Sequence, residues 1–217
     1  MRHPVSTRGG SKQCLSGTVL SEIVGFAIDP CAPDHAPVAR ASDWVARFAP
    51  LVAAGARVLD LACGYGRHAR FFAACGANVL AVDRDAAALA TLAGEARIAT
   101  RALDLEAGRW PLPGERFDAI VVVNYLHRPL FPSLLAALAE DGVLIYETFA
   151  RGNEAYGRPS NPDFLLEPGE LLQLAARGLT VVAFEQGVVS TPDPGAVVQR
   201  LAAVGPGRPW PPALPGG

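Results

Sequence analysis

The segment at 57–75 constrains this chain more than any other, because it joins a strand to a helix through a glycine-rich turn. Its first residues, RVLDLA, are largely apolar and predict a buried strand over 57–62. Gly64 and Gly66 follow, and a helix predicted over 67–75 ends before Gly76. Glycines at such a turn let the backbone approach a ligand closely, and the start of the helix offers unpaired N–H groups to an anion. The segment therefore predicts a ligand-binding unit of an α/β fold.

The rest of the chain alternates short apolar runs with helical patterns. Further strands are predicted at 78–82, 98–103, 117–123, 143–149, 179–189 and 197–204, and further helices at 42–52, 85–96, 129–139 and 168–177. Such alternation is typical of βαβ units, and a turn of sequence TPDPG between the last two strands predicts a hairpin. We therefore expect an α/β fold: a Rossmann-like, doubly wound sheet of seven mostly parallel strands with a C-terminal antiparallel hairpin.

Asp60 distinguishes between two cofactor classes that this turn can serve. Gly64, Gly66 and Ala69 fit G-x-G-x-x-A, the spacing of dinucleotide-binding enzymes. A carboxylate at position 60, near the carboxyl end of the strand, would repel a pyrophosphate and attract an ammonium group. Asp83 ends the second strand, where an acid accepts hydrogen bonds from ribose hydroxyls, and Asp104 follows the third, where it can meet an adenine amino group. This pattern favours S-adenosyl-L-methionine, which carries an amino group and no phosphate.

The order of these features resembles class I S-adenosylmethionine-dependent methyltransferases over roughly residues 41–204. The matching features are D-x-A-C-G-x-G, an acid ending strand two, an Asp after strand three and an all-apolar strand four. The sequences GRH at 66–68, NYLHR at 124–128 and RPSNPDFLL at 158–166 are most similar to small bacterial enzymes related to tellurite-resistance and thiol-directed methyltransferases. The resemblance implies S-adenosyl-L-methionine as cofactor and in-line methyl transfer to a small-molecule acceptor.

The resemblance also implies a set of site residues. The cofactor-binding residues expected on this basis are Asp60, Ala62, Gly64, Gly66, Arg67, Asp83, Arg84, Asp104, Leu105 and Asn124. Arg67 is expected to help hold the methionine carboxylate. Expected catalytic residues follow strands four and five: His127 and Glu147 as bases for an amine or hydroxyl acceptor, and Arg158 for an anionic one. Tyr146 and Glu147 point to opposite faces of their strand, and we expect Glu147 to reach the cleft.

Structural interpretations of the same residues stay open at this point. Asp60 could cap the loop, Asp83 could cap the next helix (although Asp85 is better placed), and Asp104 could be an ordinary turn residue. Both glycines could serve backbone geometry alone, and His127 could bond to nearby backbone. Two other functions also stay open: a Rossmann-type nucleotide-dependent oxidoreductase, suggested by the glycine spacing, and a non-catalytic cofactor-binding module.

Glycine and proline divide the chain into an ordered middle and two irregular ends. Residues 1–40 and 205–217 hold 17 of the 41 glycines and prolines. We expect an irregular N-terminal extension or lid over 1–40, the methyltransferase domain over 41–204, and a Pro/Gly-rich tail over 205–217 that is dispensable for cofactor binding.

Charge and cysteine usage exclude several other classes. The net charge is −2 and no basic run exists, so a nucleic-acid partner is not expected. The longest apolar run is too short to cross a bilayer, and residues 1–13 lack the apolar core of a secretory signal, so we expect a cytoplasmic protein without a membrane partner. The four cysteines lack metal-site spacing, so no metal is expected. The sequence does not indicate an oligomeric state.

Overall fold

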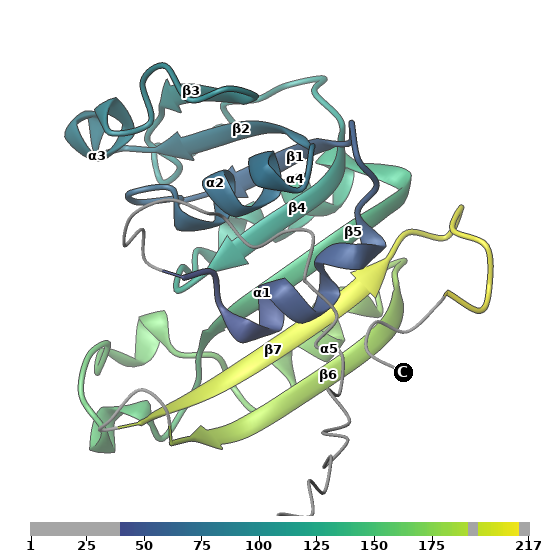
Figure 1. Cartoon of the computed structure of the whole chain (residues 1–217). Coiled ribbons are helices and arrows are strands. Elements are labelled where there is room, and N and C mark those ends of the chain that lie inside the picture. The colour runs from purple at the N-terminus through teal and green to yellow at the C-terminus, as the bar shows by residue number, and fades with distance from the viewer. Residues whose placement is uncertain (1–39, 191–194, 213–217) are drawn as a thin grey trace, which may run out of the picture.

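A computed structural model describes residues 40–190 and 195–212, which form a seven-stranded sheet in the order β3-β2-β1-β4-β5-β7-β6 (Figure 1). The strands are β1 (Arg57–Leu61), β2 (Asn78–Asp83), β3 (Ile98–Ala102), β4 (Phe117–Val123), β5 (Leu138–Phe149), β6 (Thr180–Val189) and β7 (Ala196–Val204). The first five strands pair in parallel, and β7 lies antiparallel between β5 and β6. The predicted mostly parallel sheet with a C-terminal antiparallel hairpin is therefore confirmed. The predicted turn at 191–194 lies outside the described residues.

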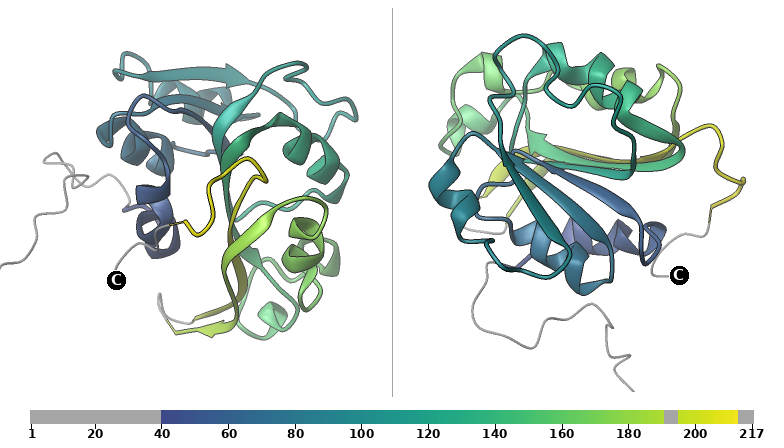
Figure 2. Two further views of the ribbon diagram at one scale, coloured as in Figure 1. Left: turned by 90° about the vertical axis from the view of Figure 1, so that its right-hand side faces the viewer. Right: turned by 90° about the horizontal axis from the view of Figure 1, so that it is seen from above.

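Helices cover both faces of the sheet (Figure 2). The α-helices are α1 (Asp43–Phe48), α2 (Arg67–Ala74), α3 (Ala86–Ala90), α4 (Phe131–Ala137) and α5 (Glu170–Ala175), and short 3₁₀ turns are η1 (Ala49–Leu51), η2 (Arg128–Leu130), η3 (Asn153–Ala155) and η4 (Pro162–Phe164). One core packs apolar residues of α1, α2 and α3 against the sheet, and the other packs α4 and α5 against the opposite face. Strand β4, of sequence FDAIVVV, contributes to both cores, as expected for a strand buried on two sides.

Two helices are shorter than the sequence predicts. Helix α3 ends at Ala90 instead of Ala96. The Thr91 hydroxyl donates a hydrogen bond to the Ala88 carbonyl, and the Arg70 guanidinium donates one to the Thr91 carbonyl, so side chains use the backbone acceptors at this end of the helix. Helix α5 begins at Glu170, after Gly169 at a φ of +74°, so Pro168 is not its first residue as predicted.

The predicted helix over 129–139 is also replaced in part. It begins as the 3₁₀ turn η2 and ends at Ala137, since β5 already starts at Leu138. The pairing of β5 with β4 shifts its register between Leu138 and Val143. The predicted Asp141-Gly142 turn therefore lies in an irregular part of β5.

The strand order reverses between β1 and β4, which have β2 and β5 on their outer sides. In open α/β sheets a crevice forms at such a switch point, outside the carboxyl ends of the strands. In Figure 1 the arrowheads of β2 and β4 mark this edge. The loops after β1, β2, β3, β4 and β5 therefore meet there, and they carry the candidate site residues.

The first residues of the expected C-terminal tail pack against the domain. The Gly205 and Gly207 N–H groups donate to the carbonyls of Gly142 and Glu140, and Arg208 donates to the Leu51 carbonyl over 2.6 Å. A Cβ at Gly205 would lie 2.1 Å from the Glu140 carbonyl oxygen, so only glycine fits there. Residues 205–208 thus continue the contacts of β7 past its end.

Candidate active site

The glycine loop after β1 turns sharply into α2. Ala62 has a φ of +54°, a conformation that costs a residue with a Cβ, and Gly64 and Gly66 have φ values of +54° and +73°. A Cβ at Gly64 would meet nothing within 4 Å, whereas one at Gly66 would lie 2.5 Å from a Leu92 methyl. Gly64 therefore borders open space, and Gly66 serves close packing of the loop against the segment after α3.

Asp83, the last residue of β2, ties this loop to the next one. Its Oδ2 accepts a hydrogen bond of 2.8 Å from the Gly64 N–H, and its Oδ1 accepts one of 2.9 Å from the Asp85 N–H. Asp85, not Asp83, caps α3, since its side chain accepts from the N–H groups of Ala87 and Ala88. The carboxylate of Asp83 thus lies at the crevice and is not used to cap the helix.

Asp60 is buried beneath the loop. The side chain is 1% exposed, and its Oδ2 makes no hydrogen bond to any residue in the described ranges 40–190 and 195–212. Burial raises the pKa of this carboxyl to about 7, although a hydrogen bond from the Ala69 backbone and the charge of Arg67 act in the opposite direction. An unpartnered buried carboxylate oxygen calls for a donor or a cation from beyond the described residues, such as a ligand.

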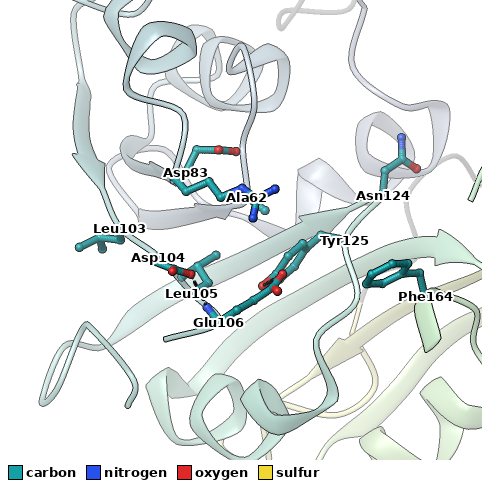
Figure 3. Close-up of a pocket in the computed structure, with 10 residues that line it drawn as sticks. Ala62, Asp83, Leu103, Asp104, Leu105, Glu106, Asn124, Tyr125 and Phe164 are labelled. Atoms are coloured by element: carbon teal, nitrogen blue, oxygen red, sulfur yellow. Dashed lines mark hydrogen bonds between the residues drawn. The ribbon is translucent and has the colours of Figure 1, made fainter. Parts of the chain in front are cut away.

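A cavity of about 400 Å³ lies at the ends of β1 to β4 (Figure 3). Six of the ten expected cofactor-binding residues line it: Ala62, Asp83, Arg84, Asp104, Leu105 and Asn124. Ala62 and Asn124 are two of the described non-glycine residues with positive φ, at +54° and +57°. Backbone strain of this kind concentrates at functional sites. The four other expected residues, Asp60, Gly64, Gly66 and Arg67, form the loop and its support beside this cavity.

Four further residues that line the cavity were not among the cofactor residues expected from the sequence: Leu103, Glu106, Tyr125 and Phe164. Glu106 stands two residues after Asp104, and its backbone N–H donates to Asp104 Oδ1 over 2.9 Å. Its carboxylate lies 3.5 Å from the Tyr125 hydroxyl. Glu106 directly follows the expected pair Asp104-Leu105 in the sequence, and this acidic residue is the signal that could have identified it.

A second cavity of about 210 Å³ adjoins the first. The two share Glu106, Asn124, Tyr125 and Phe164. The second cavity adds Leu126 after β4, Thr148 and Phe149 at the end of β5, and Pro159 from the long loop. The two cavities therefore lie next to each other, from the ends of β2 and β3 to the end of β5.

The three expected catalytic residues do not meet in this space. His127 precedes η2, where its carbonyl accepts from the Leu130 N–H. Glu147 is buried on the face covered by α1, and its Oε2 accepts from the Ser42 hydroxyl over 2.7 Å and lies 3.3 Å from Arg200 Nε. Arg158 is exposed and precedes Pro159, which lines the second cavity. None of the three lines either cavity among the described residues.

Tyr146, the neighbour of Glu147, points to the opposite face. Its hydroxyl donates to the Tyr125 carbonyl over 2.9 Å, and its ring packs edge-on against Phe131. The expected alternation along β5 is therefore present, but Glu147 turns toward α1 and Tyr146 supports the residue that lines the cavities. Complete burial raises the pKa of Tyr146, so its hydroxyl stays protonated and is a hydrogen-bond donor.

The charge of the first cavity determines which ligands it suits. Its lining includes the three acids Asp83, Asp104 and Glu106 against one guanidinium, Arg84. Carboxylates accept hydrogen bonds from hydroxyl, amino and ammonium groups and repel phosphates. In the described part of the chain, no group of three or more His, Cys, Asp and Glu side chains is arranged to hold a metal ion. In the same ranges, no helix is long and apolar enough to cross a membrane.

Comparison with known proteins connects this arrangement to methyl transfer. Residues 58–141 match a family described as methyltransferase domain. The match covers the glycine loop, the strands β1 to β4 and the ends that carry Asp83, Asp104 and Asn124. No curated protein matches the sequence significantly.

Solved structures share the fold. TehB from Haemophilus influenzae is 19% identical with a TM-score of 0.61, over 75% of this chain and 61% of that chain. The chain thus spans less than two thirds of that protein. A TehB-like S-adenosylmethionine-dependent methyltransferase from Corynebacterium glutamicum is 20% identical with a TM-score of 0.55, over 75% and 86%. The 1,6-didemethyltoxoflavin-N1-methyltransferase of Burkholderia thailandensis is 26% identical with a TM-score of 0.56, over 75% and 76%. The predicted likeness to small bacterial methyltransferases is therefore confirmed.

Proposed function

We propose that this chain, an S-adenosylmethionine-dependent methyltransferase whose methyltransferase domain includes residues 58–141, transfers a methyl group to a small-molecule acceptor. The fold, the domain match and the cofactor class are its premise. The Burkholderia thailandensis neighbour holds 1,6-didemethyltoxoflavin and S-adenosylhomocysteine, which supports a small acceptor for the present chain as well.

One observation carries the assignment of the cofactor site: three carboxylates line a single cavity beside a glycine loop. We assign Asp83 to the ribose hydroxyls and Asp104, with Leu105, to the adenine. Gly64, which borders open space, lets the loop approach the methionine part. These assignments match Asp83, Asp104 with Leu105, and Gly64 to three separate parts of the cofactor.

The support for the ammonium group comes from Asp60. Its Oδ2 lacks a partner among the described residues and its pKa is raised to about 7, so an α-ammonium group nearby would supply the missing donor and favour the ionised carboxylate. We assign Arg67, which lowers that pKa through its charge, to the methionine carboxylate. The same acids disfavour the pyrophosphate of a dinucleotide, so they argue against the oxidoreductase alternative.

The cofactor, when bound, supplies a methyl group on a sulfonium, which is a good leaving group. The residues of the chain then need to exclude water and hold the acceptor in line with that methyl group. Asn124 and Tyr125 line both cavities, so we place the acceptor beyond them in the second cavity. For Arg158, which precedes Pro159 in the chain but lines neither cavity, contact with an anionic acceptor remains a proposal. For His127 and Glu147, the role of general base remains a proposal. Glu106 and Tyr125, which line the cavities, are alternative candidates for that role.

Isothermal titration calorimetry with S-adenosylhomocysteine tests the cofactor half of the proposal. We expect the unsubstituted chain to bind with micromolar affinity and the Asp83→Ala variant to bind more weakly. The Asp118→Asn variant should bind as the unsubstituted chain does, because the Asp118 carboxylate contacts the Arg57 backbone at the other edge of the sheet. Binding of NAD in place of S-adenosylhomocysteine would instead establish the oxidoreductase alternative. Tight cofactor binding without turnover across thiols, oxyanions, amines and heterocycles would establish the non-catalytic module.

A further inference from the structure

Phe164 is a large apolar side chain that the structure holds in an exposed position. It is 49% exposed and lines the first cavity, where Figure 3 shows it. It lines the second cavity as well. Its neighbours in the sequence, Leu165 and Leu166, are fully buried. A loop that buries two leucines completely and leaves the adjacent aromatic ring at a cavity gives that ring a surface for a ligand.

The exposure of Phe164 is imposed by a network of hydrogen bonds. Arg128 donates to the carbonyls of Asp163 and Leu165, the two residues that flank Phe164, over 2.8 Å each. The same guanidinium makes a bidentate pair with Glu170, at 2.6 and 2.8 Å. Asn161 caps the turn η4 by accepting from the Asp163 N–H.

This network is electrostatically favourable in its charged form. The hydrogen bond to Glu170 raises the pKa of Arg128. Burial alone would raise the pKa of Glu170, but the hydrogen bonds from Arg128 and the Glu167 backbone hold it below its usual value. Both groups are therefore charged at neutral pH, and bidentate pairs of this kind are the more rigid ion pairs of proteins. A ring fixed in this way is preorganised for contact.

The lining of the second cavity is mostly apolar and aromatic, with two neutral polar residues, Asn124 and Thr148, and one charged group. Tyr125, Phe149 and Phe164 contribute aromatic rings, and Leu126 and Pro159 add apolar surface. Glu106 supplies a carboxylate, and none of the described residues that line this cavity is cationic. Aromatic rings stack on planar ligands, and a carboxylate attracts cations and repels anions.

We propose that the second cavity binds the methyl acceptor, and that this acceptor is a planar heteroaromatic molecule with a nucleophilic nitrogen, neutral or positively charged. Its ring contacts Tyr125 and Phe164, Glu106 selects against anions, and Arg128 is the positioning residue that holds Phe164. The inference rests on the proposed function. Where the nitrogen carries a proton, that proton first passes to the Glu106 carboxylate. The freed lone pair then forms the bond to the methyl carbon as the carbon–sulfur bond breaks and leaves its electrons on sulfur. A ring nitrogen without a proton becomes a methylated cation.

Three matched probes of one ring system test the proposal: 4-aminoquinoline, which is cationic at neutral pH, quinoline, and quinoline-4-carboxylate. Binding to the full chain saturated with S-adenosylhomocysteine is measured by calorimetry, and methylation is measured as S-adenosylhomocysteine released from S-adenosylmethionine. We expect the cationic and neutral probes to bind and the carboxylate to bind at least about ten-fold more weakly. Glu106→Gln should reduce that discrimination without weakening the binding of quinoline.

Phe164→Ala should weaken quinoline binding about ten-fold, and should weaken the binding of S-adenosylhomocysteine less, although Phe164 also lines the first cavity. Trp210→Ala is the matched control, because Trp210 is 71% exposed and lines neither cavity. Arg128→Lys should raise the KM for a methylated probe and leave kcat nearly unchanged. In the double variant with Phe164→Ala, the Arg128→Lys change should add no further loss, since it acts through that ring.

The outcomes separate this inference from the proposed function. Binding of S-adenosylhomocysteine with no binding of any quinoline, or equal binding of the three probes, would overturn the inference and leave the methyltransferase assignment in place. A Phe164→Ala variant that binds quinoline as the unsubstituted protein does would overturn it as well. Failure of S-adenosylhomocysteine to bind would overturn both.

Discussion

The site has two halves that are built differently. In the cofactor half, the groups that meet are close in the sequence: Gly64 bonds to Asp83, Asp83 bonds to Asp85, and Glu106 bonds to Asp104. In the acceptor half, the contacts join distant segments: Arg128 bonds to Glu170 and to the carbonyls that flank Phe164. The first half follows from three successive strand ends, whereas the second depends on how a long loop and two helices pack.

This difference shows where each half is vulnerable. The carboxylates Asp83, Asp104 and Glu106 of the cofactor half line a cavity, whereas Asp60 is buried at a cost. The charged groups of the acceptor half are partners of one another, so their loss affects the loop before it affects any ligand. Substitutions in the two halves should therefore separate cofactor affinity from stability.

The largest effect should come from pH acting on Asp60. Its pKa in the folded chain is about 7, above the ordinary value of 3.8, so its protonated form is favoured by folding. That contribution to the free energy of unfolding is complete below about pH 4 and is lost as pH rises through about 7, by up to about 4 kcal/mol. Urea unfolding of the cofactor-free chain from pH 4 to 8 measures it, with Asp60→Asn as the reference that lacks this titration. Parallel pH curves for the two proteins would contradict the burial argument.

Asp83→Ala should be the most damaging substitution for cofactor affinity. It removes the ribose acceptor proposed here and the bond that orders Gly64, so S-adenosylhomocysteine affinity should fall about 100-fold while the fold is retained. Calorimetry together with circular dichroism checks both parts. A variant that binds the ligand normally would remove the acid at the end of β2 from the cofactor half.

Arg128→Ala should show the reverse behaviour. It breaks a bidentate ion pair and leaves the Asp163 and Leu165 carbonyls without a donor, so stability should fall by about 1 to 2 kcal/mol after allowance for partial exposure. S-adenosylhomocysteine affinity should stay within about two-fold. Arg151→Ala is the matched control: its pair with Glu167 is exposed, and its loss should cost less than about 0.5 kcal/mol. Equal thermal unfolding of the two variants would argue against a special role for Arg128.

Truncation of the C-terminus should have the smallest effect and should depend on where the cut is made. Removal of residues 209–217 leaves the bonds of Gly205, Gly207 and Arg208 intact, so the free energy of unfolding should stay unchanged within error. Removal of 205–217 deletes those bonds and should cost about 1 kcal/mol. Chemical denaturation of both shortened chains checks this. If the two unfold alike, residues 205–208 add nothing to the domain.

The accuracy of the sequence predictions follows the same division. Six of the expected cofactor residues line one cavity, because strand ends in a parallel sheet meet at one edge whatever the details of packing. The alternation of side chains along β5 leaves two possible faces for Glu147. The packing of α1 decides between them, because Ser42 donates a hydrogen bond to Glu147. The position of Arg128 after β4 predicts a residue on the acceptor side. Its proposed role, however, depends on its pairing with Glu170, 42 positions away.

The sequence by itself determined the strand–turn–helix unit, the order of the acids after the first three strands, and so the class of cofactor. These are local patterns, and the periodicity of apolar residues is enough to place them. Only the tertiary structure decided that an Asp60 oxygen has no partner among the described residues, that Glu106 joins the acids of the cavity, and that Phe164 is exposed at the cavities that Tyr125 also lines. Burial and hydrogen-bond satisfaction depend on contacts between residues far apart in the chain, which no local pattern encodes.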